Sequence, residues 1–442
     1  MGVPIAGVAV LAALWALTPL RAAEPPQPRT IAFVGATLID GSGSPAQPNA
    51  TVLVRGERIL AVHAEAGYRP PEDAERVPLA GRYLIPGLIN THVHLATLAK
   101  PAEARAYLRR ELYSGVTTVR DMAGDVRLLG ELKREAAFDE IPAPDIYYAA
   151  LMAGPQFFAD ERTHDAARGL TPGEAPWMRA VTGSTDLARA ICEARGTGAT
   201  AIKIYADLPA SLVRAITAEA HRQGLLVWAH AAVFPASPVE VADAGVDVMS
   251  HAEFIAYQLS DPMPQSYAAM PPVSPRASQP SPALDAVFAL MQRRGIILDA
   301  TVDIGYRYPN KRWPPGLAAT ITREAVHHGV AISTGTDDDA DWSDPDSALD
   351  TEITRLVRDA GLSPMEVLVA ATRTGARTVG AEQALGTIAP GKLANFVILE
   401  RDPLQDIANV RSVLTVVKHG LQYPRSAYHP VTAEEMKGAA SP

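Results

Sequence analysis

Residues 225–251 read LLVWAHAAVFPASPVEVADAGVDVMSH and contain two apolar, β-prone runs separated by a helix start. The first run ends at His230 and the second ends at His251. Between them, Ser237-Pro-Val-Glu240 places a hydroxyl at the N-cap, proline at the first helical position and glutamate three residues after the cap. This stretch predicts a strand, a helix and a second strand, with a histidine at the carboxyl end of each strand.

The same alternation of β-prone and helical stretches continues on both sides of this unit. A second capping box begins at Ser363, and the apolar residues of 212–220 share one face of a helix expected to end at Gly224. Eight such units over roughly 250 to 300 residues match a (β/α)8 TIM barrel, whose active groups lie at the carboxyl ends of the strands. We therefore expect an α/β barrel over residues 85–380, with these β units: 83–94, 116–121, 146–151, 201–205, 225–230, 246–251, 296–300 and 330–335.

The two chain ends have a different texture. Short β-prone runs occur at 31–34 and 51–54, and runs of the same kind return at 395–399 and 413–420. We expect residues 24–84 and 381–442 to share one small β-sandwich beside the barrel.

Composition limits the partners of the chain. Its 442 residues are 48% hydrophobic and 20% charged, as in ordinary globular proteins, and the formal net charge is −9. An acidic chain gives no electrostatic reason to bind nucleic acid or anionic lipid, so we expect a small-molecule partner. The single cysteine, Cys192, excludes an intrachain disulfide and a cysteine-based zinc cage, and its helix-like surroundings suggest a small core residue. A homo-oligomer is compatible with the sequence.

Residues 1–23 resemble a signal peptide. An apolar run over 3–19 is followed by Leu-Arg-Ala-Ala, which suggests cleavage near Ala22 or Ala23. No lysine or arginine precedes the run, so an uncleaved anchor is the alternative. We expect a periplasmic or secreted protein whose mature chain has no membrane partner.

Four histidines fall at the ends of predicted barrel strands. His92-Val93-His94 closes the first strand, and alternation along a strand puts both imidazoles on one face. His230 and His251 end the fifth and sixth β units. Since strand ends meet at one mouth of the barrel, the four imidazoles are predicted to converge on a metal site.

Two further residues complete this predicted site. Lys203 ends the fourth β unit in an apolar strand, where a bare ammonium is costly unless it is paired or modified. Reaction with carbon dioxide would convert it to a carboxylated lysine, an oxygen ligand able to bridge two divalent ions; a salt-bridged lysine at the rim is the alternative. Asp337, the first of three aspartates after the eighth β unit, is the predicted general base.

Tyr205 and His164 are weaker candidates for substrate contacts, and the irregular segments 154–176 and 261–282 are predicted loops at the mouth.

Several motifs together resemble the amidohydrolase superfamily, and within it the imidazolonepropionase-related group that includes Xaa-Pro dipeptidases. The resemblance implies two divalent metal ions, with zinc expected. It further implies that His92 and His94 hold one ion with Asp337, that His230 and His251 hold the other, and that carboxylated Lys203 bridges them. The activity implied is hydrolysis of an amide or peptide-like C–N bond in a small substrate such as an N-acyl amino acid or a dipeptide. The motifs are Ile85-Pro-Gly-Leu-Ile-Asn-Thr-His-Val-His94, Gly115-Val-Thr-Thr-Val-Arg-Asp121, Lys203, His230, His251, Gly335-Thr-Asp337, Leu385-Gly-Thr-Ile-Ala-Pro-Gly-Lys-Leu-Ala394 and Asp402-Pro-Leu-Gln-Asp-Ile407.

The chain departs from the family pattern at two places, of which only the first bears on specificity. The sequence Lys203-Ile-Tyr-Ala-Asp replaces the glycine-rich stretch that often follows this lysine in the dipeptidases, which puts dipeptide specificity in doubt. Asn395 stands where the tail motif commonly has aspartate. A one-metal deaminase, a lactonase or organophosphate hydrolase, and an inactive barrel that binds a partner are the alternative interpretations.

Overall fold

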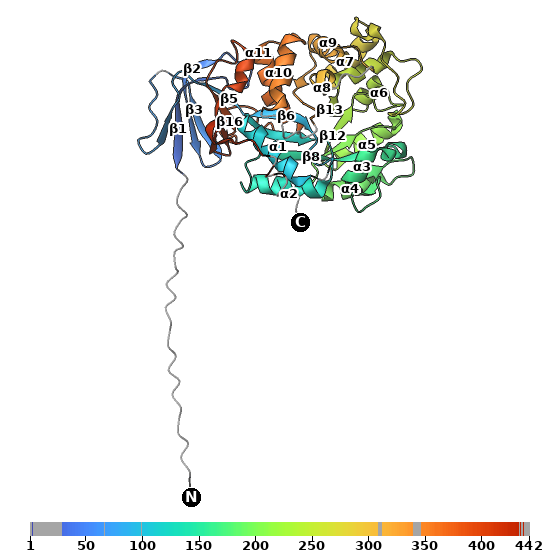
Figure 1. The fold of residues 1–442 in the computed structure, drawn as a ribbon, viewed down its shortest axis with the longest axis horizontal. Coiled ribbons are helices and arrows are strands. Elements are labelled where there is room, and N and C mark those ends of the chain that lie inside the picture. Colours follow the sequence, from blue (N-terminus) through green and yellow to red (C-terminus); the bar gives the residue numbers. More distant parts are fainter. Residues whose placement is uncertain are drawn as a thin grey trace.

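The chain folds into a barrel with a second sheet packed at one side (Figure 1). The computed structural model describes residues 29–65, 67–98, 100–307, 312–338 and 346–432, together with residues 2, 434 and 436. The predicted signal segment lies almost entirely outside the described residues. Within the described part of the chain, no helix is both long and apolar enough to cross a bilayer.

Eight parallel strands form the barrel. Neighbouring strands pair in chain order, and the last returns to the first, where Thr91 N donates to Thr334 O at 2.9 Å and Asp337 N donates to His92 O at 3.0 Å. The predicted (β/α)8 fold is confirmed. The strands are β6 (Leu88–Val93), β7 (Val116–Asp121), β8 (Asp145–Ala153), β11 (Ala201–Ile204), β12 (Leu226–His230), β13 (Val248–Ser250), β14 (Ile297–Asp299) and β15 (Ile332–Ser333).

Helices surround the strands and begin as the sequence predicts. Both capping boxes form, because Glu240 and Glu366 each accept from the backbone N–H of their N-cap serine. The expected face of α5 is buried at Val213, Ile216 and Ala220. Cys192 lies exposed on α4, so the expectation of a core position was wrong. The main helices are α1 (Pro101–Tyr113), α2 (Val126–Ala137), α4 (Leu187–Gly196), α5 (Ala210–Arg222), α6 (Pro238–Asp243), α7 (Pro282–Arg294), α9 (Leu317–His327), α10 (Ala348–Arg358) and α11 (Pro364–Val369).

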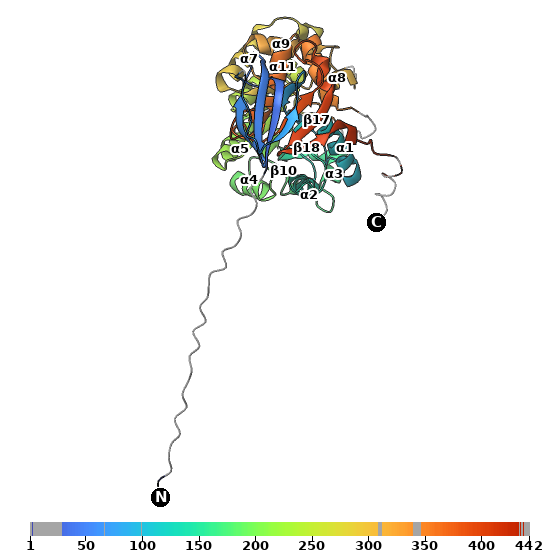
Figure 2. The ribbon, with the colours of Figure 1, turned by 90° about the vertical axis from the view of Figure 1, so that its left-hand side faces the viewer.

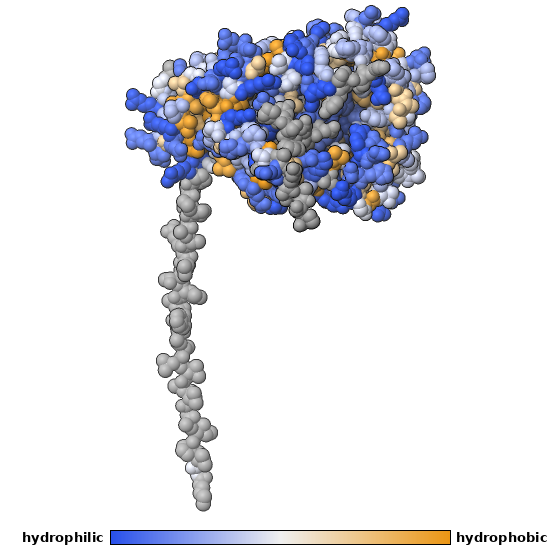
Figure 3. Space-filling model, viewed as in Figure 1, coloured by the Kyte–Doolittle hydropathy of each residue, from blue (hydrophilic) through white to orange (hydrophobic). Residues whose placement is uncertain are grey.

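Both chain ends contribute to the second sheet, as predicted. Its core includes Phe33 and Phe396, whose rings meet edge to face with centroids 5.0 Å apart. Figure 2 looks onto this sheet, with the barrel behind it. Hydrophilic residues cover most of the face seen in Figure 3, and the hydrophobic residues on that face gather mainly over this sheet. Its strands are β1 (Thr30–Leu38), β2 (Gln47–Arg55), β3 (Arg58–His63), β4 (Glu75–Pro78), β5 (Tyr83–Pro86), β16 (Phe396–Leu399), β17 (Val413–Lys418) and β18 (Leu421–Pro424).

The stretch 83–94, expected to be one barrel strand, forms two strands in different sheets. β5 pairs with β1 and β16 in the sheet built from the chain ends, whereas β6 pairs with β7 in the barrel. The break lies at Gly87, where a Cβ atom would come within 2.1 Å of Thr117 Oγ1. A glycine here lets the backbone pass closely over β7 as it turns from the sheet into the barrel.

The predicted mouth loops contain short regular elements. The segment after β8 folds into η1 (Pro155–Ala159), α3 (Glu161–Ala166), β9 (Glu174–Ala175) and β10 (Met178–Ala180). The segment after β13 begins with the 3-10 helix η2 (Ala252–Leu259) and contains η3 (Pro275–Ser278). A short helix, α8 (Ile304–Arg307), follows β14. These three segments all contribute side chains to one cavity at the carboxyl ends of the strands.

Candidate metal centre

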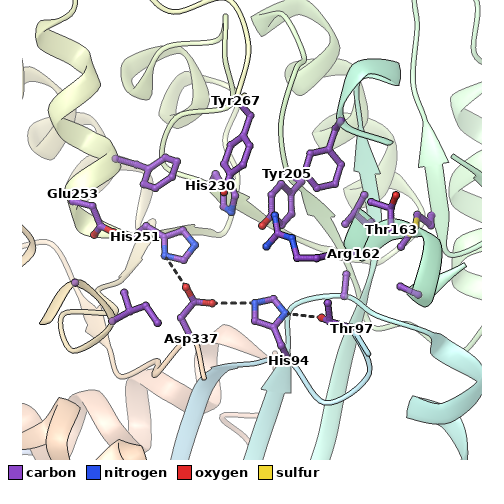
Figure 4. Close-up of a pocket in the computed structure, with 18 of the residues that line it drawn as sticks. His94, Thr97, Arg162, Thr163, Tyr205, His230, His251, Glu253, Tyr267 and Asp337 are labelled. Carbon is purple, nitrogen blue, oxygen red and sulfur yellow. Dashed lines mark hydrogen bonds and ion pairs between the residues drawn. The ribbon is translucent and has the colours of Figure 1, made fainter. Parts of the chain in front are cut away.

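The six predicted ligands come from the carboxyl ends of the barrel strands. His92 and Lys203 lie within β6 and β11, and His230 is the last residue of β12. The other three follow the strands directly or after a short turn. Figure 4 shows His94, His230, His251 and Asp337 around one cavity.

His92, His94 and Asp337 form the tightest part of the cluster. Asp337 Oδ1 lies 3.2 Å from His92 Nε2 and 3.0 Å from His94 Nε2. Each of the three residues offers one potential ligand atom, and these three atoms lie within 4.8 Å of one another. Two imidazoles and a carboxylate at this spacing are a suitable donor set for a divalent transition metal.

The imidazole of His92 is oriented by a buried carboxylate. Its Nδ1 donates to Asp299 Oδ2 at 2.7 Å. In a neutral imidazole the Nε2 atom is then an acceptor, and it faces the Asp337 carboxylate oxygen. Two acceptors at 3.2 Å repel each other unless a cation lies between them, so this pair fits a metal ion.

His251 and His230 extend the cluster to the other side of Asp337. His251 Nδ1 lies 3.9 Å from Asp337 Oδ2, and the ring centroids of His251 and His230 are 4.9 Å apart. Burial lowers the pKa of His251 to about 3 and holds the pKa of His230 well below its ordinary value, with the Lys203 ammonium adding to the effect at His230. Both rings are therefore neutral near pH 7, which is the state that binds metals. His230 Nδ1 is buried and has no hydrogen-bond partner among the described residues.

Lys203 is completely buried, and its Nζ atom has no hydrogen-bond partner within the described part of the chain. The Tyr205 ring centroid lies 5.7 Å away from this atom. Burial, together with the nearby Arg120 guanidinium, lowers the pKa of Lys203 to about 7. A neutral amine at this place is chemically ready to react with carbon dioxide, and the resulting carboxylate would supply a negative charge that a metal ion would stabilise.

Asp337 keeps its negative charge although it is half-buried. Desolvation alone would raise the pKa of this carboxyl, but the neighbouring imidazoles of His92 and His94, 3.2 and 3.0 Å from Oδ1, hold it well below the ordinary value. Its backbone adopts φ 52°, a left-handed conformation that is uncommon for aspartate and turns the side chain toward the imidazoles. The carboxylate can bind a metal and accept a proton.

A cavity of about 240 Å³ opens next to this cluster. Rings form much of its wall: the centroid of Tyr205 lies 4.1 Å from that of His230 and 4.4 Å from that of Phe157. Tyr205 therefore lies where the sequence suggested a substrate contact. His164 does not: it is exposed on α3, and it is not among the residues that line the cavity, whereas Arg162 and Thr163 of the same helix are. A short helix in an irregular segment has no periodicity from which this orientation could be predicted.

A model of the amidohydrolase family matches residues 83–422 of the chain. The chain belongs to the amidohydrolase family. Ochratoxinase of Aspergillus niger is 25% identical to this amidohydrolase over 441 residues, covering 86% of this chain and 82% of that protein. A Xaa-Pro dipeptidase with bound methionine has a TM-score of 0.70 at 21% identity, over 89% of this chain and 100% of that structure. Molinate hydrolase has a TM-score of 0.71 at 19% identity, over 92% and 99%. These structures confirm the fold, and the family confirms a hydrolase that acts on C–N bonds.

Two buried carboxylates of this amidohydrolase were not predicted. Asp299, the last residue of β14, accepts hydrogen bonds from His92 and Ser250 and pairs with Arg120 at 2.9 Å. Its position at the end of a predicted strand is the same signal that marked the histidines, so the sequence could have revealed it. Glu253, in η2, lines the cavity, and nothing in its sequence surroundings distinguishes it.

Proposed function

We propose that this amidohydrolase is an exported, binuclear enzyme that hydrolyses the amide or peptide-like bond of a small substrate. The observation that carries the proposal is the buried Lys203 Nζ atom, which has no hydrogen-bond partner among the described residues although it lies beside the histidine cluster. A carboxylated lysine bridging two ions would remove this uncompensated buried amine.

The donor set divides naturally around that bridge. His92 and His94 would hold one ion with Asp337, and His230 and His251 would hold the other. Zinc is the proposed metal, because neutral imidazoles and carboxylates are its common ligands. When bound, such ions polarise a carbonyl and lower the pKa of a coordinated water.

Asp337 supplies the proton transfers. Its low pKa keeps it ionised, so it can accept a proton from the attacking water near the scissile carbonyl. It then returns that proton to the leaving nitrogen. This second step is necessary for amides because an amine anion is a very poor leaving group, whereas esters depend on it less.

The proposed substrates are N-acyl amino acids and dipeptides. Two of the similar proteins, the Xaa-Pro dipeptidase and an N-acyl-D-aspartate deacylase of Alcaligenes xylosoxydans xylosoxydans that is 30% identical over 223 residues, carry names that describe cleavage next to an amino acid. The cavity of about 240 Å³ suits molecules of this size. A one-metal deaminase would need no ligand lysine, so Lys203 favours the binuclear hydrolase.

Hydrolysis by the purified mature chain tests this proposal. A panel of dipeptides and N-acyl amino acids is incubated with zinc-loaded protein and with protein treated with a chelator. Release of a free amino acid by the zinc-loaded protein, lost on chelation and restored by zinc, is the expected result. Cleavage of no compound in the panel, together with deamination of aminopurines, would overturn it. Export is tested separately by sequencing the amino terminus of protein recovered outside the cytoplasm, which is expected to begin after residue 22 or 23.

A further inference from the structure

Glu253 is a buried carboxylate that the proposed metal centre and proton transfers do not use. It lies two residues after His251, is 4% exposed and lines the cavity. Its Oε2 atom is fully buried and has no hydrogen-bond partner in the described part of the chain. Figure 4 shows the side chain beside His251, at one side of the cavity.

A carboxylate in this position is costly without a partner. Desolvating an unpaired acidic group disfavours folding, and buried polar groups in native proteins are nearly always hydrogen bonded. A neutral glutamine or a leucine would fill similar space at less cost. The retained acid therefore points to a cationic or donor group that arrives with the substrate.

The opposite side of the cavity carries a positive charge. Arg162 in α3 donates from Nε and Nη2 to the Asp160 carboxylate, at 3.0 and 2.8 Å. This fork orients the guanidinium, whose side chain is exposed, and Nη1 makes no hydrogen bond among the described residues. In Figure 4 the Arg162 side chain lies beside Tyr205, with Asp337 and His230 between it and Glu253.

The Glu253 carboxyl group and the Arg162 guanidinium thus flank the proposed reacting atoms. A dipeptide with free ends has the matching polarity: an α-ammonium on the acyl side of its peptide bond and an α-carboxylate on the amine side. The two Cα atoms are about 3.8 Å apart across that bond, so both charges stay within one small cavity. An N-acyl amino acid has the carboxylate but lacks the ammonium.

We propose that Glu253 binds the α-ammonium and Arg162 the α-carboxylate of an unblocked dipeptide, so that dipeptides are preferred over N-acyl amino acids. This inference rests on the proposed function and narrows its substrate class. The ammonium would pair with the Glu253 carboxylate, and Nη1 of the Arg162 guanidinium would donate to the substrate carboxylate. Both residues act by recognition, without a part in the proton transfers.

A matched set of substrates tests the proposal on the zinc-loaded enzyme. Glycyl-phenylalanine and N-acetyl-phenylalanine differ only in the ammonium group, and glycyl-phenylalaninamide lacks only the carboxylate charge. We expect the wild type to show a kcat/KM at least about tenfold higher for glycyl-phenylalanine than for either of the other two. Glu253→Gln should abolish the preference over the N-acetyl compound by lowering kcat/KM for glycyl-phenylalanine at least about tenfold, with the zinc content unchanged. Arg162→Gln should abolish the preference over the amide.

Glu161→Gln is the matched control, because Glu161 is an exposed acid next to Arg162 that does not line the cavity. It should retain both preferences. Equal cleavage of the three compounds by the wild type, or preferences that survive in the Glu253 and Arg162 variants, would overturn the inference and leave the proposed function standing. If the wild type cleaves none of the three compounds, the proposed function is overturned, and binding of glycyl-phenylalanine measured by calorimetry then tests the inference. We expect Glu253→Gln to bind it at least about tenfold more weakly than the wild type. Equal binding would contradict the inference.

Discussion

Asp299 Oδ2 accepts a hydrogen bond from His92 Nδ1 at 2.7 Å, and this contact decides which nitrogen of His92 faces the site. The carboxylate is itself fixed by Ser250 at 2.9 Å and Arg120 at 2.9 Å, in a fully buried setting. Carboxylates that orient a ligand histidine in this way tune metal affinity without touching the metal.

Replacing this carboxylate should weaken metal binding. In Asp299→Asn the neutral amide cannot neutralise the positive charge of Arg120 and makes a weaker hydrogen bond to the His92 imidazole. We therefore expect the zinc affinity to fall by about 10- to 100-fold. Competition with a fluorescent zinc chelator measures the change. Ser250→Ala, which removes one hydrogen bond to the same carboxylate, is the milder control. Unaltered affinity in Asp299→Asn would show that the contact has only a structural role.

Loss of the proposed proton carrier should affect amides more than esters. Asp337→Asn retains an oxygen that can bind a metal but cannot accept and return a proton, so we expect kcat for an amide substrate to fall by about 10²- to 10⁴-fold. The fall for the matching ester should be smaller because its leaving group needs less protonation. Steady-state kinetics on the pair, with zinc content measured for each preparation, makes the comparison. Equal losses for both substrates would argue against proton return by Asp337.

Much of this site follows from one rule, that polar residues at strand ends meet at the barrel mouth. Applied to the sequence alone, the rule identifies the four histidines, Lys203 and Asp337. It applies equally to Asp299, which lies near the end of the predicted 296–300 unit. Residues from the segments after β8 and β13 could not be predicted in this way, because short helices such as α3 do not show which side they turn to the cavity. That is why the sequence pointed to His164, whereas Arg162 of the same helix lines the cavity.

The fold was predictable for the same reason, since strand and helix periodicities alternate over most of the chain. Residues 83–94 are the exception. They are largely apolar and β-prone, so composition gives no sign that β5 and β6 belong to different sheets. The decisive contact, between Gly87 and Thr117, joins two separate strand regions that only the folded barrel brings together.

A polar cluster between the barrel and the second sheet makes stability depend on pH. His419 Nε2 lies 2.9 Å from Asp145 Oδ2, and Lys418 Nζ lies 3.2 Å from Asp145 Oδ1. Asp145 raises the pKa of His419 above 6.5; burial opposes ionisation of Asp145, but His419 and Lys418 hold its pKa below 3.8. Stabilisation by charged His419 is therefore complete below about pH 6.5 and is lost as the pH rises through the pKa of His419 in the folded protein. Stabilisation by ionised Asp145 has the opposite dependence and is lost only as the pH falls below about 3.8.

His419→Asn tests this pH dependence. Asparagine tolerates the positive φ of 50° at this position but is too short to replace the imidazole contact. We expect the free energy of unfolding to fall by about 1 kcal/mol near pH 6, and the difference from wild type to shrink toward about pH 9. Urea unfolding at a series of pH values measures both. A difference that is constant with pH would mean that the charge of His419 contributes nothing.

The bridged metal centre is tested by the metal content per chain of wild type and Lys203→Ala, determined by elemental analysis of the purified mature protein. We predict about two zinc ions in the wild type, and one or none in the variant with loss of amide hydrolysis. Lys133→Ala is the control, since Lys133 lies on α2 over the Tyr148 ring and should retain both ions. One zinc ion in the wild type, unchanged in Lys203→Ala, would contradict the bridged centre and favour a one-metal enzyme.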